Sequence, residues 1–277
     1  MLWNVKTEKH NRLPSMNIQF SPTKRDNLID IINQWLQTLN SVQDDMWESF
    51  MDQSHHWSIR NDEEVIGYAC INQENQLLQF YILPKYQNFG EKSFTKLLSE
   101  KGIKDAVVCT NNPFFLHTTL IHNTQVKSHS YLFSNPIHVS IPERDGEINQ
   151  ANQNDLERMI NFCHYSMGAP KSWLEQYLSN LIQREELYIF EKDEIIMGTI
   201  EVRCRDHYPL YASLGMIVSP DFRGKGIGTY LLGQAKEMAI EMGKSPICSC
   251  ELENIASLKA IHKNGFRSTD QMLKITF

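Results

Sequence analysis

Three glycines at alternate positions constrain this chain more than any other feature. They stand in the run Arg223-Gly-Lys-Gly-Ile-Gly228, between an apolar segment that ends at Val218 and a long amphipathic segment. Because glycine adopts positive φ at no steric cost, the run predicts a tight turn of bare backbone that enters a helix. The first N–H groups of a helix have no internal partners and its dipole adds positive charge there, so the turn predicts an anion site. Arg223 and Lys225 add two cations, and a phosphate or pyrophosphate is the expected ligand.

The segments around this run predict a mixture of helices and strands. Apolar residues at helical spacing predict helices over 154–165, 172–182, 227–242 and 255–263. Short apolar runs bounded by turn residues predict strands over 187–190, 195–202, 210–218 and 246–251, followed by a final strand. Before them, the polar stretch 142–146 contains a proline and a glycine, which is typical of a linker or a long turn.

The first half repeats three landmarks of the second half in the same order. The paired segments are Val65-Ile66-Gly67 with Ile196-Met197-Gly198, Pro84–Gly90 with Pro220–Gly226, and Asn112 with Asn254. A repeat that keeps its order predicts a duplicated domain, and chance similarity between two α+β segments is the alternative. We therefore expect one domain over 1–142 and a second over 143–277. Of the three glycines the first copy keeps only Gly90, so we expect it to retain the shape without the anion site.

Several phosphate-binding loops compete for the glycine run. The P-loop is excluded because its Lys-Ser/Thr ending is missing, and the dinucleotide-binding fingerprint needs its third glycine one residue later. A glycine-rich turn without a ligand is a further alternative, which the flanking cations disfavour. The spacing Arg223-x-x-Gly226-x-Gly228 fits the acyl-coenzyme A loop of the GNAT N-acetyltransferases without a gap.

Residues 214–266 resemble the core of a GNAT acetyltransferase. A second motif supports the resemblance, because Asn254-Ile-Ala-Ser-Leu-Lys-Ala-Ile-His-Lys-Asn-Gly265-Phe266 is similar to the family pattern N-x-x-S-x-x-x-Y-x-x-x-G-F. The first half resembles an eroded copy of the same domain. The resemblance implies an α+β fold of two tandem GNAT-like domains, each with a mixed, mostly antiparallel central sheet flanked by helices.

The resemblance also implies a site for acetyl-CoA as cosubstrate, without a metal. The strand end at 216–218 would pair with the pantetheine arm, the loop 223–229 would wrap the pyrophosphate, and Asn254 would reach the pantetheine or the acyl end. Ser257 would do likewise, or would only cap the helix or remain solvated in its first turn. The residues implied for the cofactor are Met216, Ile217, Val218, Arg223, Gly224, Lys225, Gly226, Ile227, Gly228, Thr229, Asn254 and Ser257.

The activity implied is direct transfer of an acetyl group from acetyl-CoA to an amine of a small-molecule acceptor. The family often places a tyrosine acid four residues before the Gly-Phe pair, but Ile261 stands there, and His262 is turned away by about 100°. An incoming ammonium needs a base, and Glu201 is the nearest acidic candidate unless it is a solvated strand-end carboxylate. Residues 206–208 follow it and are expected near the acceptor. A non-catalytic acyl-CoA-binding or regulatory protein is the alternative function.

Composition limits the other classes. The net charge of −6 argues against a nucleic-acid partner and weakly favours a cationic acceptor. Without a run of 18 apolar residues no membrane partner is expected, and residues 1–14 lack the pattern of a secretion signal. Six cysteines without a CxxC pair predict reduced thiols, no metal site and a cytoplasmic location. Cys248 and Cys250 are expected to be core side chains on one face of a strand.

Overall fold

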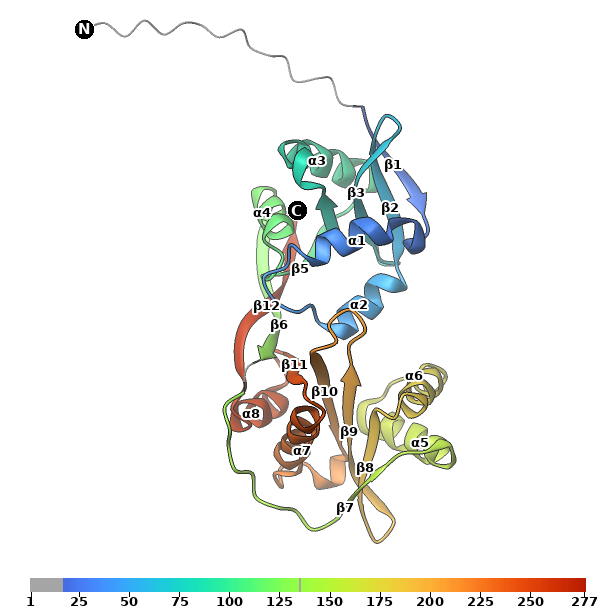
Figure 1. Cartoon of the computed structure of the whole chain (residues 1–277), viewed down its shortest axis with the longest axis vertical. Helices are drawn as coiled ribbons and strands as arrows, with labels where there is room; N and C mark the ends of the chain where they lie inside the picture. Colours follow the sequence, from blue (N-terminus) through green and yellow to red (C-terminus); the bar gives the residue numbers. More distant parts are fainter. Residues whose placement is uncertain (1–16, 135) are drawn as a thin grey trace, which may run out of the picture.

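A single twelve-stranded sheet runs through the molecule (Figure 1). The computed structural model describes residues 17–134 and 136–277, so the segment 1–14 lies outside the described residues. The strands are β1 (Ile18–Thr23), β2 (His55–Asn61), β3 (Glu64–Ile71), β4 (Leu77–Ile82), β5 (Asp105–Cys109), β6 (Gln125–Ser134), β7 (Glu147–Gln150), β8 (Leu187–Lys192), β9 (Ile195–Cys204), β10 (Tyr211–Val218), β11 (Ser245–Glu251) and β12 (Arg267–Thr276).

Helices flank both faces of the sheet. They are α1 (Ile29–Leu36), α2 (Asp45–Asp52), α3 (Gly90–Lys101), α4 (Pro113–Ile121), α5 (Leu156–Met167), α6 (Lys171–Gln183), α7 (Ile227–Glu241) and α8 (Ile255–Lys263). Short 3₁₀ turns cover Arg25–Leu28, Pro84–Phe89, Gln153–Asp155 and Pro220–Phe222. The predicted α+β class is confirmed.

The sheet has the same order when it is followed from either edge. Its order is β1-β2-β3-β4-β5-β12-β6-β11-β10-β9-β8-β7, so β1 to β5 match β7 to β11. Gly67 of β3 and Gly198 of β9 occupy equivalent positions, where each lies close to a carbonyl oxygen of the neighbouring strand. A Cβ atom on Gly67 would lie 2.2 Å from the Tyr81 carbonyl oxygen, and one on Gly198 would lie 2.7 Å from the Ile217 carbonyl oxygen. The predicted duplication is therefore confirmed in the fold.

The two copies exchange their last strands. β12 pairs antiparallel with β5 of the first copy, and β6 pairs antiparallel with β11 of the second. β6 and β12 also pair with each other through the middle of the sheet. Backbone hydrogen bonds therefore join the copies directly, in addition to the connecting segment.

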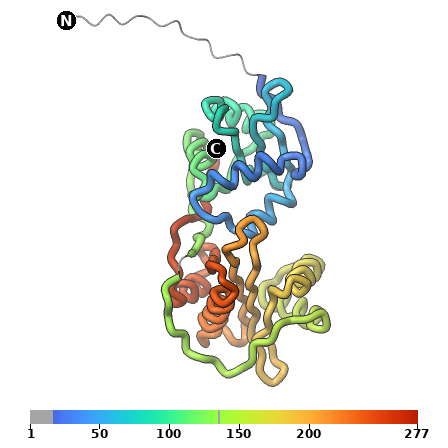
Figure 2. The backbone as a smooth tube through the Cα atoms, in the orientation of Figure 1, coloured from blue at the N-terminus to red at the C-terminus, as the bar shows by residue number. Residues whose placement is uncertain are grey.

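The connecting segment lies along the second copy as a strap, defined here as residues 136–146. Figure 2 shows it running from the end of β6 around this copy to the start of β7. Ile137 donates its N–H to the Gly265 carbonyl oxygen at 3.1 Å, and Ile141 packs against the core beneath α7. Near its end, Arg144 lies beside Gly226 at the N-terminus of α7.

Each copy buries a core on both faces of the sheet. In the second copy α7 and α8 cover one face, with Leu214, Leu231 and Ile261 in that core, and α5 and α6 cover the other. Cys248 and Cys250 are buried on the α7 face, as predicted, and all six cysteines are free thiols. Within the described residues, no helix is both long and apolar enough to cross a membrane.

Candidate active site

The glycine run forms an open turn at the N-terminus of α7. Gly224 and Gly226 adopt φ of 77° and 81°, the left-handed region predicted for them. A Cβ atom on Gly224 would meet nothing within 4 Å, and the first turn of α7 receives no side-chain cap. The N–H groups of Gly228 and Thr229, in the first turn of α7, therefore have no side-chain cap. Free N–H groups at the N-terminus of a helix favour the binding of an anion.

Three cations lie at this turn, and one of them escaped sequence analysis. Arg223 donates to the carbonyl oxygens of Val218 (3.2 Å) and Ser166 (2.6 Å), so it ties β10 to the end of α5. Lys225 donates to the Asp221 carbonyl oxygen at 3.1 Å. Arg144 of the strap instead lies over Gly226, its Nη2 2.5 Å from where a Cβ atom would be.

β10 and β11 separate beside the turn. They pair in parallel only from Tyr211↔Ser245 to Ser213↔Ile247, whereas β10 stays paired with β9 as far as Val218. The ladder between β10 and β11 therefore leaves residues 214–218 without a strand partner on the β11 side. Met216, Ile217 and Val218 lie on this edge, where the sequence predicts the pantetheine arm.

The second motif begins on the far side of this separation. Asn254 accepts the Ser257 N–H at 3.1 Å and thereby caps α8, so the cap is Asn254 and not the Ser257 side chain. Ile261 is 3% exposed and packs in the core, and the His262 ring packs edge-on to Phe133 at 5.4 Å. At the position where the family often has a tyrosine, this chain therefore has a buried core side chain. Isoleucine has no proton to donate to a leaving thiolate.

The matching region of the first copy is filled by its own side chains. Gln79 of β4 accepts a hydrogen bond from Asn112 at 2.9 Å, and Phe80 stacks on Phe114 at 6.1 Å. A Cβ atom on Gly90 would lie 2.8 Å from the Phe114 ring. The glycine turn is replaced by the 3₁₀ turn 84–89, so the first copy keeps the fold without an open anion turn.

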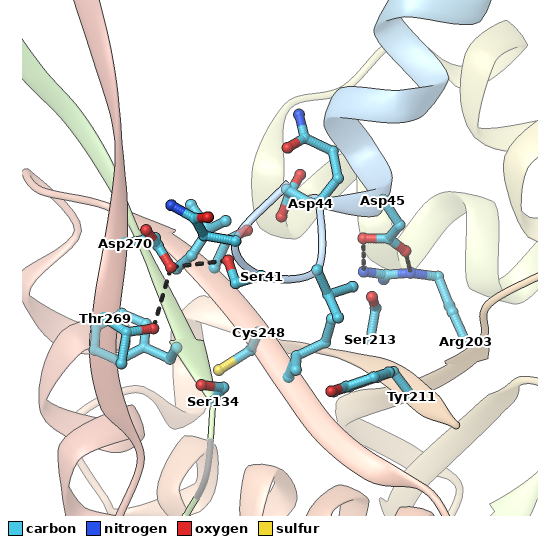
Figure 3. Close-up of a pocket in the computed structure, with 17 residues that line it drawn as sticks. Ser41, Asp44, Asp45, Ser134, Arg203, Tyr211, Ser213, Cys248, Thr269 and Asp270 are labelled. Carbon is cyan, nitrogen blue, oxygen red and sulfur yellow. Dashed lines mark hydrogen bonds and ion pairs between the residues drawn. The ribbon is translucent and has the colours of Figure 1, made fainter. Parts of the chain in front are cut away.

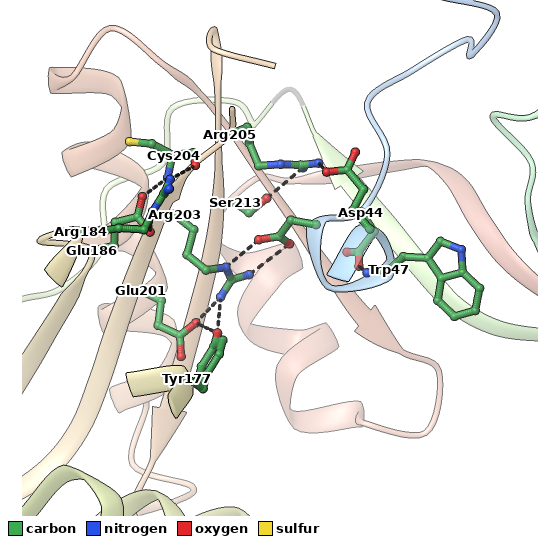
Figure 4. Close-up of polar contacts among 12 residues, drawn as sticks. Asp44, Trp47, Tyr177, Arg184, Glu186, Glu201, Arg203, Cys204, Arg205 and Ser213 are labelled. Carbon is green, nitrogen blue, oxygen red and sulfur yellow. Dashed lines mark hydrogen bonds and ion pairs between the residues drawn. The ribbon is translucent and has the colours of Figure 1, made fainter. Parts of the chain in front are cut away.

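Glu201 lies in a buried ion-pair cluster rather than in solvent. Its side chain accepts from the Tyr177 hydroxyl at 2.7 Å and pairs with Arg203, and the residue is 6% exposed. The alternative of a solvated carboxylate is wrong. Arg203 also pairs with Asp45 of the first copy at 2.7 Å (Figure 3), and Figure 4 shows its contacts with Glu201 and Tyr177. Burial opposes the charge of Asp45, but Arg203 outweighs it and lowers the pKa of Asp45.

A cavity of about 350 Å³ lies where the two copies meet (Figure 3). Ser213 and Ile247 line it, and they are the last pair before β10 and β11 separate, so the cavity adjoins the apex of that separation. The segment 40–45 of the first copy contributes a further wall. The charged residues of the lining are Asp44, Asp45, Asp270 and Arg203.

The first copy holds its wall in place through α2. Glu48 pairs with Arg205 at 2.9 Å, and Arg205 donates to the Gln43 carbonyl oxygen at 2.8 Å. Trp47 packs against the strands of the exchange. The loop 206–208, expected near the acceptor, does not line the cavity. Its His207 instead lies against α1 and α2.

Two family models match the chain, one to each half. The model described as "Acetyltransferase (GNAT) domain" matches residues 24–136, and the model described as "Acetyltransferase (GNAT) family" matches residues 154–266. The chain is a tandem of two GNAT acetyltransferase domains. It is therefore an acyltransferase.

Solved structures resemble this tandem GNAT protein over most of its length. An acetyltransferase of the GNAT family from Colwellia psychrerythraea is 27% identical, with a TM-score of 0.89, and the match covers 94% of this chain and 99% of that one. A GCN5-related N-acetyltransferase from Sphaerobacter thermophilus is 14% identical, with a TM-score of 0.66 and coverages of 94% and 95%. A tandem GNAT protein from the clavulanic acid biosynthesis pathway is 11% identical, with a TM-score of 0.66 and coverages of 94% and 98%. The last two show the shared fold. A search of curated proteins found no match.

The tandem GNAT arrangement explains which site residues sequence analysis missed. Asp44 and Asp270 belong to no motif, and only the packing of one copy on the other brings them together. Arg144 stands in a stretch interpreted as a linker. Its position before β7 carried no local sign of a ligand.

Proposed function

We propose that this protein transfers an acetyl group from acetyl-CoA, held by the second copy, to an amine of a small cationic acceptor held in the cavity between the copies. The observation that carries the proposal is the place of the cavity. It adjoins the apex of the β10–β11 separation, and three carboxylates but one guanidinium line it. An excess of negative charge favours an ammonium over a neutral or anionic acceptor.

The second copy fits coenzyme A because its turn and its strand edge are open. Backbone N–H groups from Gly224 to Thr229, with Arg144 and Lys225, would hold the pyrophosphate. The edge 216–218 would hydrogen-bond the pantetheine amides as an added strand would. Ile227 and Gly228 would support the turn, and Asn254 and Ser257 would stand at the other wall. The described residues of the first copy offer no equivalent, so one site per chain is expected.

The chemistry follows from alignment. Acetyl-CoA supplies an activated thioester when it is bound. The cavity holds the amine against the apex where the acyl end would arrive, and alignment of this kind removes much of an entropic barrier. A backbone N–H of β10 would stabilise the negative charge that develops on the carbonyl oxygen. The cytoplasmic location inferred from the sequence belongs to this proposal.

Direct assay tests the proposal. The full chain is incubated with acetyl-CoA and a panel of mono- and diamines, each paired with the alcohol of the same skeleton, and products are identified by mass spectrometry. We expect amides from amines and at least about 100-fold less product from the alcohols. Tight acetyl-CoA binding with no transfer to any amine would replace this proposal by the alternative, a non-catalytic acyl-CoA-binding protein. That alternative gains support only from the missing acid at Ile261.

A further inference from the structure

The carboxyl groups around the cavity differ in how fully they are paired. Asp45 and Glu201 share the Arg203 guanidinium, so each already has a cationic partner. Asp270 accepts hydrogen bonds from three hydroxyl groups, those of Ser41 (2.8 Å), Thr110 (2.8 Å) and Thr269 (3.3 Å). The oxygens of these three carboxyl groups already have cationic or hydroxyl partners, so they are less free to bind an incoming ammonium.

Asp44 is the exception. One of its oxygens accepts the Trp47 N–H at 2.9 Å and so caps α2, and the Ser249 side chain is its other hydrogen-bonding neighbour. No ion pair involves Asp44 among the residues that the structure describes. Its side chain is half-buried and lines the cavity, so an acceptor in the cavity can reach it.

We propose that Asp44, contributed by the first copy, is the general base of the reaction catalysed at the second copy's site. This inference rests on the proposed function. The ammonium of the acceptor binds to the Asp44 carboxylate and gives it one proton, breaking an N–H bond and forming an O–H bond. The freed nitrogen lone pair then bonds to the acetyl carbon while the carbon–sulfur bond breaks. The second amine proton passes to the departing sulfur, and Asp44 returns its proton to solvent.

The electrostatic surroundings suit this role. Burial, and next the Asp45 carboxylate, raise the pKa of Asp44 above the ordinary value of an aspartate. A raised pKa brings the pKa of Asp44 closer to that of the acceptor's ammonium group, which makes proton transfer between them easier. The titratable and charged groups that face Asp44 or the same cavity are Asp45, Arg203, Cys109, Tyr211, Cys248 and Asp270.

Three of these neighbours keep one charge state near pH 7. Burial raises the pKa of Cys109 to about 12, and it also raises that of Cys248, so both thiols stay neutral near pH 7. Arg203 stays charged because Asp45 and Glu201 outweigh the effect of its burial and raise its pKa. The activity should therefore fall as the pH drops through the raised pKa of Asp44.

The decisive variant is Asp44→Asn. Asparagine caps a helix as well as aspartate does, so α2 and the fold should persist, but an amide cannot accept the proton. With an amine that the wild type acetylates, kcat/KM should fall by about 10²–10⁴-fold and the acidic limb of its pH profile should vanish. The KM for acetyl-CoA should stay near the wild-type value. Without acetyl-CoA, the same amine should raise the melting temperature of the wild type but not of Asp44→Asn.

Two further variants separate this role from others. Asp30→Asn removes an exposed carboxylate from α1 of the same copy and should match the wild type in every readout. Glu201→Gln should keep the acidic limb, and loss of that limb in Glu201→Gln but not in Asp44→Asn would overturn the inference in favour of Glu201. A wild-type pH profile in Asp44→Asn would also overturn it, while the proposed function would stand on wild-type turnover. If the wild type acetylates no amine, the proposed function fails, and equal amine-induced melting shifts in wild type and Asp44→Asn would overturn the Asp44 site as well.

Discussion

Arg203 of β9 and Asp45 of α2 form an ion pair at 2.7 Å although they belong to different copies. Their side chains are 15% and 18% exposed, and the same guanidinium also pairs with Glu201. The pair therefore holds the segment 40–45 of the first copy, which lines the cavity, against β9 of the second copy. Because it is mostly shielded from water, removing one partner costs more than it would in an ion pair on the surface, since the other charge stays buried without it.

Asp45→Asn should lower the free energy of unfolding by about 1–3 kcal/mol, because it removes a hydrogen-bonded charge and leaves Arg203 with one carboxylate. Chemical denaturation measures this. The matched control is Asp52→Asn, which breaks the more exposed pair with Arg25 inside the first copy and should cost under about 1 kcal/mol. Equal losses in the two variants would mean that the contact between copies contributes nothing special.

Gly224→Asp should weaken coenzyme A binding at least about tenfold, which is about 1.4 kcal/mol. Aspartate and asparagine both tolerate left-handed backbone, and a Cβ atom meets nothing here, so the change tests charge rather than space. Gly224→Asn is the matched control and should bind more tightly than Gly224→Asp. Calorimetry should also give one site per chain. Unchanged affinity in Gly224→Asp, or two equal sites, would remove the turn as the pyrophosphate site.

Arg144→Gln should reduce coenzyme A affinity by about tenfold, since a hydrogen bond to a charged group contributes about 1.5 kcal/mol or more. The variant should also show a weaker dependence of affinity on salt, because one cation at the turn is lost. Lys24→Gln removes an exposed cation of the first copy and serves as the control. Equal coenzyme A affinity in Arg144→Gln and Lys24→Gln would show that the strap does not contribute to cofactor binding.

Glu48 predicts a pH effect on stability. Burial raises its pKa to about 7 despite the ion pair with Arg205. The folded protein therefore holds this proton more tightly than the unfolded chain, so stability falls as the pH rises from about 4.5 to about 7. Glu48→Gln should flatten the dependence in this window and gain about 1–3 kcal/mol above pH 7 relative to the wild type. Denaturation at several pH values checks this, and a loss of stability at high pH would show that the pair with Arg205 outweighs burial.

Apart from β7, which the sequence analysis did not predict, the helices and strands of the second copy agree with those predicted to within a few residues, and α8 has the predicted bounds. These elements are predictable because strong apolar periodicity and terminal glycines, which are local features of the sequence, determine them. The glycine turn was predictable for the same reason. The strand exchange was not, because β6 and β12 carry no residue that distinguishes a partner in the same copy from one in the other. Asp44 and Arg144 were missed because their surroundings come from segments far away in the chain.

The exchange of β6 and β12 also dictates the order of events during synthesis. β12 follows every other strand along the chain, yet it lies between β5 and β6 in the middle of the sheet. A ribosome therefore releases all of the first copy before the strand that completes its sheet exists, and β5 must wait with an unpaired edge. Because each copy's sheet needs a strand exchanged with the other copy, neither copy can be gained or lost as a separate domain. The eroded copy thus persists as part of one folding unit.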